Sequence, residues 1–239
     1  MKRALVTGGS GTIGSAICRR LAQDGLHVIA HAHTNPALAE ALVDEIHGSG
    51  GSAEVTCFDV CDADESFHAV EALLTHGPIQ VLVHNAGIHD DVPMAGMTRA
   101  QWKRVIDVSL NGFFNVTQPL LLPMMRTRWG RVISLSSVAG IMGNRGQANY
   151  AAAKSGLHGA SKSLAIELAS RGVTVNVVAP GIIASPISET TFSAELIERV
   201  VPMKRAGTPP EVAELVAFLA SDRASYISGQ VISINGAMA

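Results

Sequence analysis

Strand-like and helix-like segments alternate along the whole chain, and this alternation constrains the fold more than any other feature. Aliphatic runs typical of buried strands occupy residues 2–7, 27–32, 53–58, 80–83, 131–135, 173–178 and 230–234. Helical patterns separate them at 12–24, 36–47, 63–75, 99–125, 149–170 and 210–220. A strand that returns through a helix to a parallel neighbour belongs to a sheet with both faces covered. The sequence therefore predicts an α/β fold with a doubly wound, seven-stranded parallel sheet and helices on both faces.

The composition fits one such sheet. A chain of 239 residues can bury the core of one large domain, and no repeat or linker divides it, so we expect a single domain over 1–239. Net charge is −2, which provides no general attraction to nucleic acid or to an anionic membrane. No apolar run reaches the roughly 18 residues that a membrane span needs.

Cysteine and histidine usage bears on compartment and metals. Cys18, Cys57 and Cys61 are odd in number, and we interpret them as reduced, buried thiols of a cytoplasmic protein. His31 and His33 alternate onto one face of a predicted strand, but no cluster of other ligands joins them. We therefore expect no metal site.

Two segments are expected to be irregular. Pro119 falls inside the helical stretch 99–125, where a proline removes a hydrogen bond and bends the axis. Residues 182–208 are weakly patterned and contain Pro186 and Pro202. We expect them to form a mobile substrate lid with one short helix.

The most informative side chains are Tyr150 and Lys154, four residues apart in an alanine-rich segment. Residues i and i+4 of a helix share a face, with Cβ atoms roughly 5–6 Å apart. An ammonium beside a phenol lowers the phenol's ordinary pKa of about 10, which makes it a usable proton donor. The alternative is a packed aromatic beside a solvated lysine, which so short a motif does not exclude. Ser137 lies thirteen residues before the tyrosine and completes a candidate trio.

A glycine-rich turn follows the first predicted strand. Residues 7–14 read Thr-Gly-Gly-Ser-Gly-Thr-Ile-Gly and lead directly into a helix. Glycines permit a tight turn, and the free N–H groups of a helix N-terminus attract a pyrophosphate. An ordinary strand–helix turn has no need of four glycines. The sequence predicts a dinucleotide-binding turn here.

Together these motifs resemble the short-chain dehydrogenase/reductase family. Thr7-Gly8, Asn85-Ala86-Gly87, Ser137 with Tyr150-x-x-x-Lys154, and Pro180-Gly181 follow one another in the family's order across the whole chain. Within the family, residues 143–154 and 173–181 are most similar to 3-oxoacyl-(acyl carrier protein) reductases. The resemblance implies a Rossmann-like cytoplasmic homotetramer in fatty acid or related acyl-chain synthesis, a branch of lipid metabolism. It would reduce a 3-oxoacyl thioester to the 3-hydroxyacyl thioester with NAD(P)H.

The resemblance also implies roles for single residues. Tyr150 would be the general acid, with Lys154 lowering its pKa and holding the nicotinamide ribose. Ser137 would hydrogen-bond the substrate carbonyl, with Ser136 as the adjacent candidate. Asp59 would contact the adenine amino group, unless it is simply a helix cap. The full set of cofactor-binding residues implied in this way is Gly8, Ser10, Gly11, Thr12, Ile13, Gly14, His33, Thr34, Asp59, Val60, Asn85, Ala86, Gly87, Tyr150, Lys154, Pro180, Gly181, Ile183 and Ser185.

Two positions depart from the family pattern. Thr12 replaces a glycine of the turn, and Gly11 before it would let the turn shift. Ser109 stands where the family has an active-site asparagine that relays protons, and Asn111 lies too far around the helix to replace it. We count Ser109 among the candidate catalytic residues, because a relay through its backbone carbonyl would survive the change.

The end of the second predicted strand bears on the choice of dinucleotide. An acidic residue there would bind a ribose 2′-hydroxyl and repel a 2′-phosphate. The sequence has His33-Thr34-Asn35 instead, which favours NADP(H) over NAD(H), although no lysine or arginine follows. His33 would assist with charge only when protonated.

The resemblance suggests partners as well. Arg128 and Arg171 fall where carrier-protein reductases keep arginine for docking to acyl carrier protein, an acidic partner. The alternative is a solvated surface, with Arg171 complementing a helix C-terminus. The tetramer would form through the apolar faces of 99–125 and 149–170 with residues 229–239.

Two other functions remain open. One is a reductase of a coenzyme A ester, a free ketone or a polyketide-like chain. The other is a dinucleotide-binding sensor with little catalysis, which only Thr12 and Ser109 favour.

Overall fold

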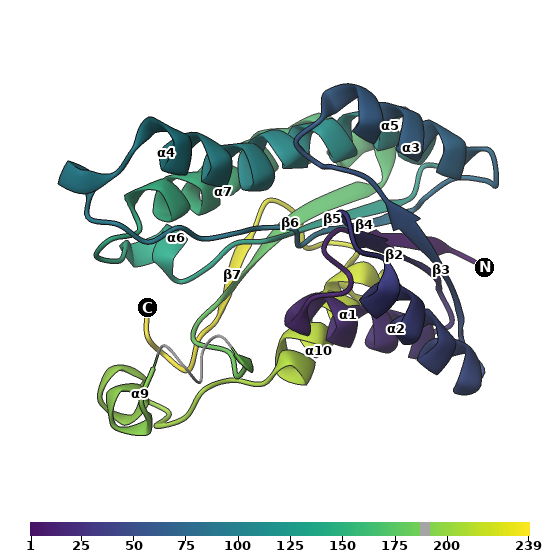
Figure 1. The fold of residues 1–239 in the computed structure, drawn as a ribbon. Coiled ribbons are helices and arrows are strands. Elements are labelled where there is room, and N and C mark those ends of the chain that lie inside the picture. Colours follow the sequence, from purple (N-terminus) through teal and green to yellow (C-terminus); the bar gives the residue numbers. More distant parts are fainter. Residues whose placement is uncertain (187–191) are drawn as a thin grey trace.

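The computed structural model describes residues 1–186 and 192–239, and its centre is a seven-stranded parallel sheet (Figure 1). The strand order is β3-β2-β1-β4-β5-β6-β7, and every neighbouring pair is parallel. The order reverses between β1 and β4, and ligands of open α/β sheets bind at such a switch point. The strands are β1 Arg3–Val6, β2 His27–Ala32, β3 Ser52–Cys57, β4 Val81–His84, β5 Gly130–Leu135, β6 Val173–Pro180 and β7 Val231–Ile234.

Helices cover both faces of the sheet, so the predicted fold class is confirmed. On one face lie α1 Thr12–Gln23, α2 Ala37–Gly48 and α10 Pro209–Ala220 (Figure 1). On the other lie α3 Ala63–Leu74, α4 Arg99–Ile106, α5 Gly112–Thr127 and α7 Ala148–Leu168. The short helices are α6 Ala139–Met142 and α9 Ala194–Val200, and the 3₁₀ turns are Met94–Gly96, Ala169–Arg171 and Asp222–Ala224.

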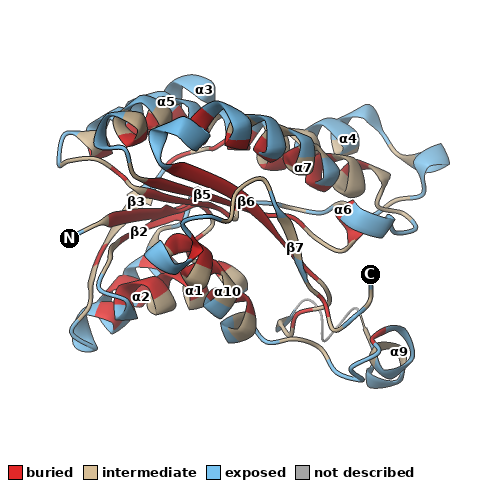
Figure 2. Cartoon of the chain, turned by 180° about the vertical axis from the view of Figure 1, so that it is seen from behind, coloured by how far each residue is buried: buried red, intermediate tan, exposed pale blue. Residues whose placement is uncertain are grey.

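Each face of the sheet has its own hydrophobic core. Successive strand residues point to opposite faces, so Val6 packs among α1, α2 and α10, while Leu5 packs among α3, α5 and α7. Figure 2 shows the result: the central strands are buried throughout, whereas each helix is buried only on its inner side. Rigid strands of this kind hold the loops at their carboxyl ends in fixed positions.

The helical stretch at 99–125 differs from the prediction. Its hydrogen bonding changes at a π-helical turn over Asp107–Asn111, and α5 then continues through Pro119. The irregularity thus lies before the proline, where the chain passes the carboxyl ends of the strands. Single π-helical turns often occur at functional sites.

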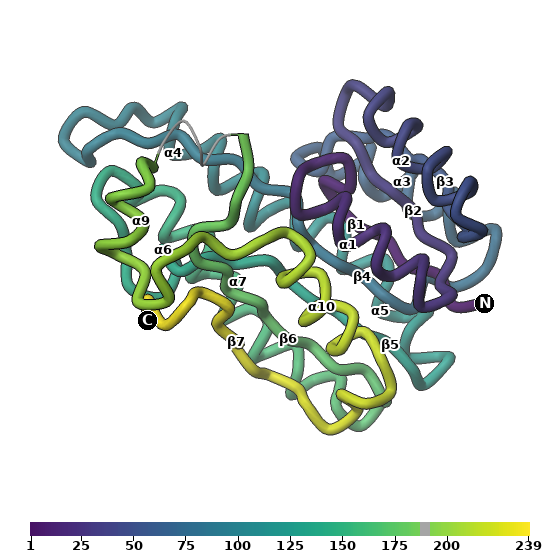
Figure 3. Tube along the Cα trace, turned by 90° about the horizontal axis from the view of Figure 1, so that it is seen from below, coloured from purple at the N-terminus to yellow at the C-terminus, as the bar shows by residue number. Residues whose placement is uncertain are grey.

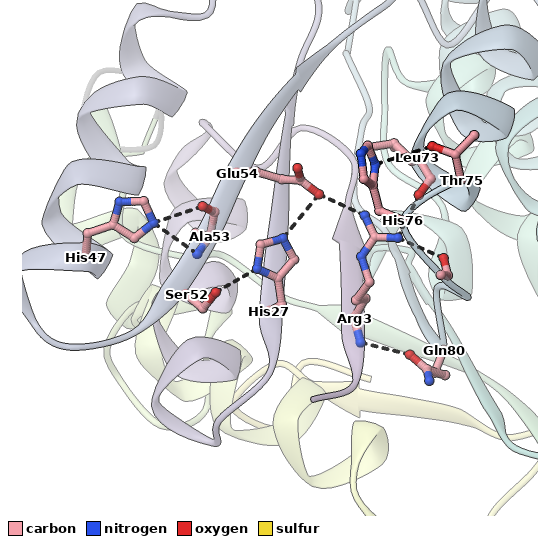
Figure 4. A network of polar contacts seen from close by, with 11 residues as sticks. Arg3, His27, His47, Ser52, Ala53, Glu54, Leu73, Thr75, His76 and Gln80 are labelled. Atoms are coloured by element: carbon pink, nitrogen blue, oxygen red, sulfur yellow. Dashed lines mark hydrogen bonds and ion pairs between the residues drawn. The ribbon is translucent and has the colours of Figure 1, made fainter.

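A polar network closes the amino edge of the sheet (Figure 4). The buried Arg3 guanidinium donates to the carbonyls of Leu73 (2.7 Å) and Gly77 (2.8 Å), and to Glu54 Oε1 (2.8 Å). His27 Nε2 lies 3.1 Å from the same Glu54 oxygen. These contacts join β1, β2, β3 and the end of α3, far from the carboxyl edge.

The cysteines were predicted to be buried, and this is wrong for two of them. All three thiols are free, and Cys18 is buried in α1. Cys57 ends β3 and is exposed, while Cys61 sits in the following turn and is half-buried. The sequence pattern missed this because β3 ends at the carboxyl edge, where side chains leave the core.

The predicted lid, 182–208, is described apart from residues 187–191. Its two ends lie side by side, because Ala184 N donates to Gly207 O (2.8 Å) and Gly207 N donates to Ile182 O (2.9 Å). Figure 3 shows α9, its one described helix, beside the C-terminus. In the parts of the chain described, none of the helices combines the length and apolarity required to cross a membrane.

Candidate active site

The glycine-rich turn runs from the end of β1 into α1. Gly8 has a φ of +62°, a region that glycine adopts without strain. A Cβ on Gly14 would overlap the carbonyl oxygen of Gly8 and lie 2.9 Å from Asn85 Nδ2. Gly11 has a φ of −74°, a backbone conformation that other residues also adopt. Thr12 is the exposed first residue of α1 and fits this position as it stands.

His31 fixes the turn from β2. The Gly8 amide donates to His31 Nδ1 (3.1 Å), and His31 Nε2 donates to the carbonyl of Phe58 (2.9 Å). Burial lowers the pKa of His31 to about 4, so the ring is neutral near neutral pH and can accept through Nδ1. His33, two residues on, is exposed, so the two histidines do not form one site.

A cleft of about 750 Å³ opens over this turn at the carboxyl edge of the sheet. Most of the predicted cofactor-binding residues line it. They are Gly8, Ser10, Gly11, Thr12, Ile13, Gly14, His33, Asp59, Val60, Asn85, Ala86, Gly87, Tyr150, Lys154, Pro180, Ile183 and Ser185. The cleft thus runs from the end of β2, across the glycine turn, to α7, a path that suits an elongated dinucleotide.

Two predicted cofactor-binding residues do not line the cleft. Thr34 lies just beyond His33 in an exposed bend. Gly181 packs against the end of β7, where an added Cβ would lie 2.8 Å from the Asn235 Cα. The structure explains this glycine by close packing between β6 and β7.

Asn85 braces the cleft floor. Its amide nitrogen Nδ2 donates to the carbonyls of Thr7 and Gly8, both at 3.0 Å. The backbone amides of Asn85 and Ala86 donate to Thr7 Oγ1, also at 3.0 Å. These bonds tie the end of β4 to the end of β1, so the switch point is rigid. The Asn85 carboxamide is committed to the protein in this arrangement.

Helix α7 presents the predicted catalytic pair. Lys154 is buried; its Nζ donates to the Leu135 carbonyl (2.8 Å) and lies 5.6 Å from the centre of the Tyr150 ring. Ser137 lies close enough to Tyr150 to lower the pKa of its hydroxyl, so the trio comes together in the fold. Ser136, the adjacent candidate, is instead bonded to the Lys154 carbonyl (3.1 Å) and to His158 Nε2 (2.7 Å).

The electrostatics of the pair differ from the prediction. Burial raises the pKa of Tyr150 above its ordinary value, the Ser137 hydrogen bond partly opposes this, and the charge of Asp91 raises it further. Burial also lowers the pKa of Lys154 to about 8. The expectation that Lys154 makes Tyr150 more acidic is therefore wrong for this structure: desolvation dominates both groups.

Ser109 lies behind Gly87, inside the π-helical turn. Its hydroxyl is buried and has no hydrogen-bond partner among residues 1–186 and 192–239. A Cβ added to Gly87 would lie 2.9 Å from Lys154 Nζ and 3.4 Å from Ser109 Oγ, so both polar atoms border one small space. Asn111 turns away and donates to Asp107 Oδ1 (2.8 Å), as its place on the helix predicts.

Asp59, in the turn after β3, is not the cap of the following helix. Asp62, not Asp59, caps α3, by accepting from the Glu65 amide. Asp59 Oδ1 accepts from the Cys61 amide (2.8 Å), and its other oxygen lies 3.6 Å from His33 Nε2. The carboxylate and the imidazole therefore face each other at the mouth of the cleft.

Several cleft residues carried no sequence motif. They are His31, Ala32, Cys61, Ile88, Arg104, Val108, Leu135 and Ser136. Arg104 reaches the cleft from α4 and pairs with Asp90 (2.6 Å). Such a residue can be recognised only when the fold shows that α4 crosses the carboxyl edge of the sheet. The local sequence around Arg104 does not reveal this.

The predicted docking arginines lie at the other edge of the sheet. Arg128 precedes the first residue of β5, and its guanidinium donates to the Ser170 carbonyl (3.1 Å), beside Arg171. Ser137 follows the last residue of β5. A six-residue strand is roughly 20 Å long, so the arginines and the cleft of one chain are well separated.

Comparison with known proteins agrees with this geometry. A family model described as enoyl-(acyl carrier protein) reductase matches residues 8–238. The chain is 45% identical over 241 residues to a 3-oxoacyl-(acyl carrier protein) reductase of Staphylococcus aureus, covering 99% of this chain and 98% of the relative. It is 44% identical over 237 residues to one of Synechocystis, covering 98% and 96%. A third, from Aggregatibacter actinomycetemcomitans, is 41% identical over 236 residues and 98% of both chains.

Proposed function

Because the chain belongs to the short-chain dehydrogenase/reductase family, and so is an oxidoreductase that binds a nicotinamide dinucleotide, we propose that it reduces a 3-oxoacyl thioester with NADPH. The product is the 3-hydroxyacyl thioester of fatty acid or related acyl-chain synthesis. The observation that carries the proposal is the placement of Tyr150 and Lys154 together in the cleft that opens over the glycine turn, with Ser137 close to Tyr150.

The residues of the cleft fit a dinucleotide. Because Gly8 and Gly14 have no side chain, the turn packs tightly against itself and against Asn85 at the start of α1. Gly11, before the helix, has no side chain to cap it, so the first amides of α1 are left for an anion. When bound, the nicotinamide supplies a hydride to the ketone carbon.

Side chains of the protein would then bind and protonate the carbonyl oxygen of the substrate. The Ser137 hydroxyl donates a hydrogen bond to the substrate carbonyl and fixes its position. Tyr150 donates its proton to the alkoxide, which is a far stronger base than a phenolate. A raised pKa keeps Tyr150 protonated at neutral pH, as a proton donor must be. The Lys154 ammonium lies near enough to stabilise the phenolate that forms.

The mouth of the cleft favours NADPH over NADH. No acid ends β2, so the residue that would bind a ribose 2′-hydroxyl and repel a 2′-phosphate from that strand is missing. His33 lies there and can donate to the phosphate, although Asp59 at 3.6 Å competes for the same ring nitrogen. We expect the ratio kcat/KM to be higher for NADPH, with His33→Ala narrowing the difference.

The acyl carrier is proposed from the named relatives. By their names, these relatives act on 3-oxoacyl groups attached to acyl carrier protein. We assign Arg128 and Arg171 to docking of that acidic partner. Since both lie at the amino edge, they serve a cleft only if another subunit brings its carboxyl edge beside them. The proposal therefore includes a homotetramer. Large apolar side chains exposed on the outer helices favour such contacts: Phe114 (65%), Leu122 (61%) and Ile166 (81%).

A substrate panel tests the function. Purified protein is given NADPH or NADH with 3-oxoacyl thioesters on acyl carrier protein and on coenzyme A, a free ketone, and a 2-enoyl thioester. We expect NADPH to be consumed fastest with the carrier-protein 3-oxoacyl substrate. Preference for the coenzyme A ester or the ketone would favour another reductase of the family. Consumption of NADPH with the 2-enoyl thioester alone would show that the protein reduces a carbon–carbon double bond. Binding of NADPH without any consumption would favour the sensor.

A further inference from the structure

His84 is a buried histidine that no motif singled out. It ends β4, one residue before Asn85, and its ring is fully buried and packs edge-on against Phe113 with ring centres 5.6 Å apart. Its Nε2 lies 2.8 Å from the backbone carbonyl of Ser109, and its Nδ1 lies 3.5 Å from Thr7 Oγ1. The ring thus spans from the end of β1 to the π-helical turn.

The hydrogen bonds around the ring define its proton. Thr7 Oγ1 already accepts from the amides of Asn85 and Ala86, so its own hydrogen is free to point at His84 Nδ1. Nδ1 therefore accepts, and Nε2 carries the hydrogen that it donates to the Ser109 carbonyl. Burial lowers the pKa of His84 to about 3, the nearby charge of Lys154 acts in the same direction, and the hydrogen bond to Ser109 opposes them only in part. The ring is neutral and keeps this tautomer at any pH used for assay.

The turn that His84 holds carries a group of the active site. Ser109 Oγ borders the same small space as Lys154 Nζ and has no partner among the described residues. A π-helical turn contains one residue more than an α-helical turn, so its position needs support from outside the helix. His84 Nε2 supplies that support from the rigid end of β4.

We propose that His84 is a positioning residue, which fixes the π-helical turn 107–111 and thereby holds the Ser109 hydroxyl beside the Lys154 ammonium. The inference rests on the proposed function, because it concerns the geometry of the same reaction. His84 neither donates a proton to the substrate nor accepts one in this proposal. His84 affects the reaction only through the position of Ser109.

Two substitutions separate the effect of the His84 hydrogen bond from the effect of the size of its side chain. His84→Phe keeps a ring but loses the donor, whereas His84→Gln can place an amide N–H near the position of Nε2. We expect His84→Phe to lower kcat by about 10- to 100-fold, since displacement of about 1 Å at a site can cost about 100-fold. The KM for NADPH should stay within about 3-fold, because His84 meets the glycine turn only at Thr7 Oγ1, through a long contact of 3.5 Å. His84→Gln should recover most of the kcat, with an unchanged pH profile.

A matched control sits elsewhere in the fold. His47 of α2 also contacts the backbone through Nε2, which lies 2.9 Å from the carbonyl oxygen and 3.3 Å from the amide nitrogen of Ala53, but it lies outside the cleft. His47→Phe should leave kcat unchanged. Ser109→Ala removes the hydroxyl and leaves the carbonyl that His84 binds. In the Ser109→Ala background, His84→Phe should therefore lower kcat much less than it does in the wild-type protein.

Amide hydrogen exchange provides a readout that needs no substrate. In His84→Phe, exchange at residues 107–111 should become faster while β4 and β5 keep their protection. Wild-type kcat in His84→Phe, equal losses in His84→Phe and His84→Gln, or unchanged exchange would each overturn the proposal. If the wild type reduces no 3-oxoacyl thioester, the proposed function fails, yet the exchange measurement still decides whether His84 holds the turn.

Discussion

At the scale of single residues, the glycine turn offers the sharpest contrast. Gly14 leaves no room for a Cβ, because the Gly8 carbonyl occupies the place, whereas a Cβ on Gly11 would meet that same oxygen at 3.3 Å. We expect Gly14→Ala to raise the Kd for NADPH about 10-fold or more, because overpacking costs about 1–3 kcal/mol. Gly11→Ala, the matched control, should change it little. Fluorescence titration of NADPH measures both, and equal affinities in the two variants would contradict this account of the turn.

The residue scale also shows where sequence reasoning succeeds and stops. Spacing placed Tyr150 and Lys154 together, because the i and i+4 positions share a helix face, whereas the role of Ser137 came from the family resemblance. It gave the wrong direction for the pKa of Tyr150, since burial raises this pKa and the influence of Ser137 opposes it only in part. It also missed His31 and His84, whose importance depends on carbonyls 27 and 25 residues away in the chain. Burial and long-range partners are properties of the folded chain.

At the scale of elements, the amino-edge network of Figure 4 ties three strands together and should make stability depend on pH. Burial tends to raise the pKa of Glu54, but hydrogen bonds from Arg3 and His27 outweigh it, and the net pKa is lowered. A lowered carboxyl pKa contributes stability above the ordinary glutamate pKa of about 4.3, and loses it as the pH falls through the folded value.

We therefore expect Glu54→Gln to lower the free energy of unfolding by about 1 kcal/mol at pH 7. The difference from wild type should shrink as the pH falls below about 4. Urea unfolding at several pH values measures it, with Glu40→Gln on the exposed side of α2 as the control. A difference that stays constant down to pH 3 would show that the charge of Glu54 is not what matters.

The elements themselves were mostly predictable. Hydrophobic periodicity placed every strand within a few residues, because parallel strands buried on both faces read as aliphatic runs. It did not reveal the π-helical turn at Asp107–Asn111, since one inserted residue barely disturbs the pattern of a long helix. Pro119 lies inside α5, after this turn.

At the scale of the whole molecule, the proposed docking arginines lie far from the cleft of their own chain, so the docking proposal includes an assembly of subunits. We expect light scattering to give the mass of a tetramer, and Leu122→Asp with Ile166→Asp to reduce it, since both side chains are exposed and apolar in one chain. A wild-type monomer at assay concentrations would contradict the proposed arrangement.

Docking can be tested on the same scale. Arg128→Glu with Arg171→Glu should raise the KM for carrier-protein substrates about 10-fold or more, because reversed charges repel an acidic partner. The KM for coenzyme A substrates should stay the same. Arg223→Glu, an exposed arginine beside Phe218, is the control. A loss shared by both carriers would indicate damage to the fold or assembly.

The central claim is that one phenol protonates the substrate oxygen. The chain has two tyrosines, Tyr150 in the cleft and the fully exposed Tyr226, so each serves as the control for the other. In single-turnover reduction of a 3-oxoacyl thioester, Tyr150→Phe should be slower by about 100-fold or more, the usual contribution of a general acid, with NADPH binding retained. Tyr226→Phe should react like the wild type. Turnover by Tyr150→Phe at the wild-type rate would contradict the account.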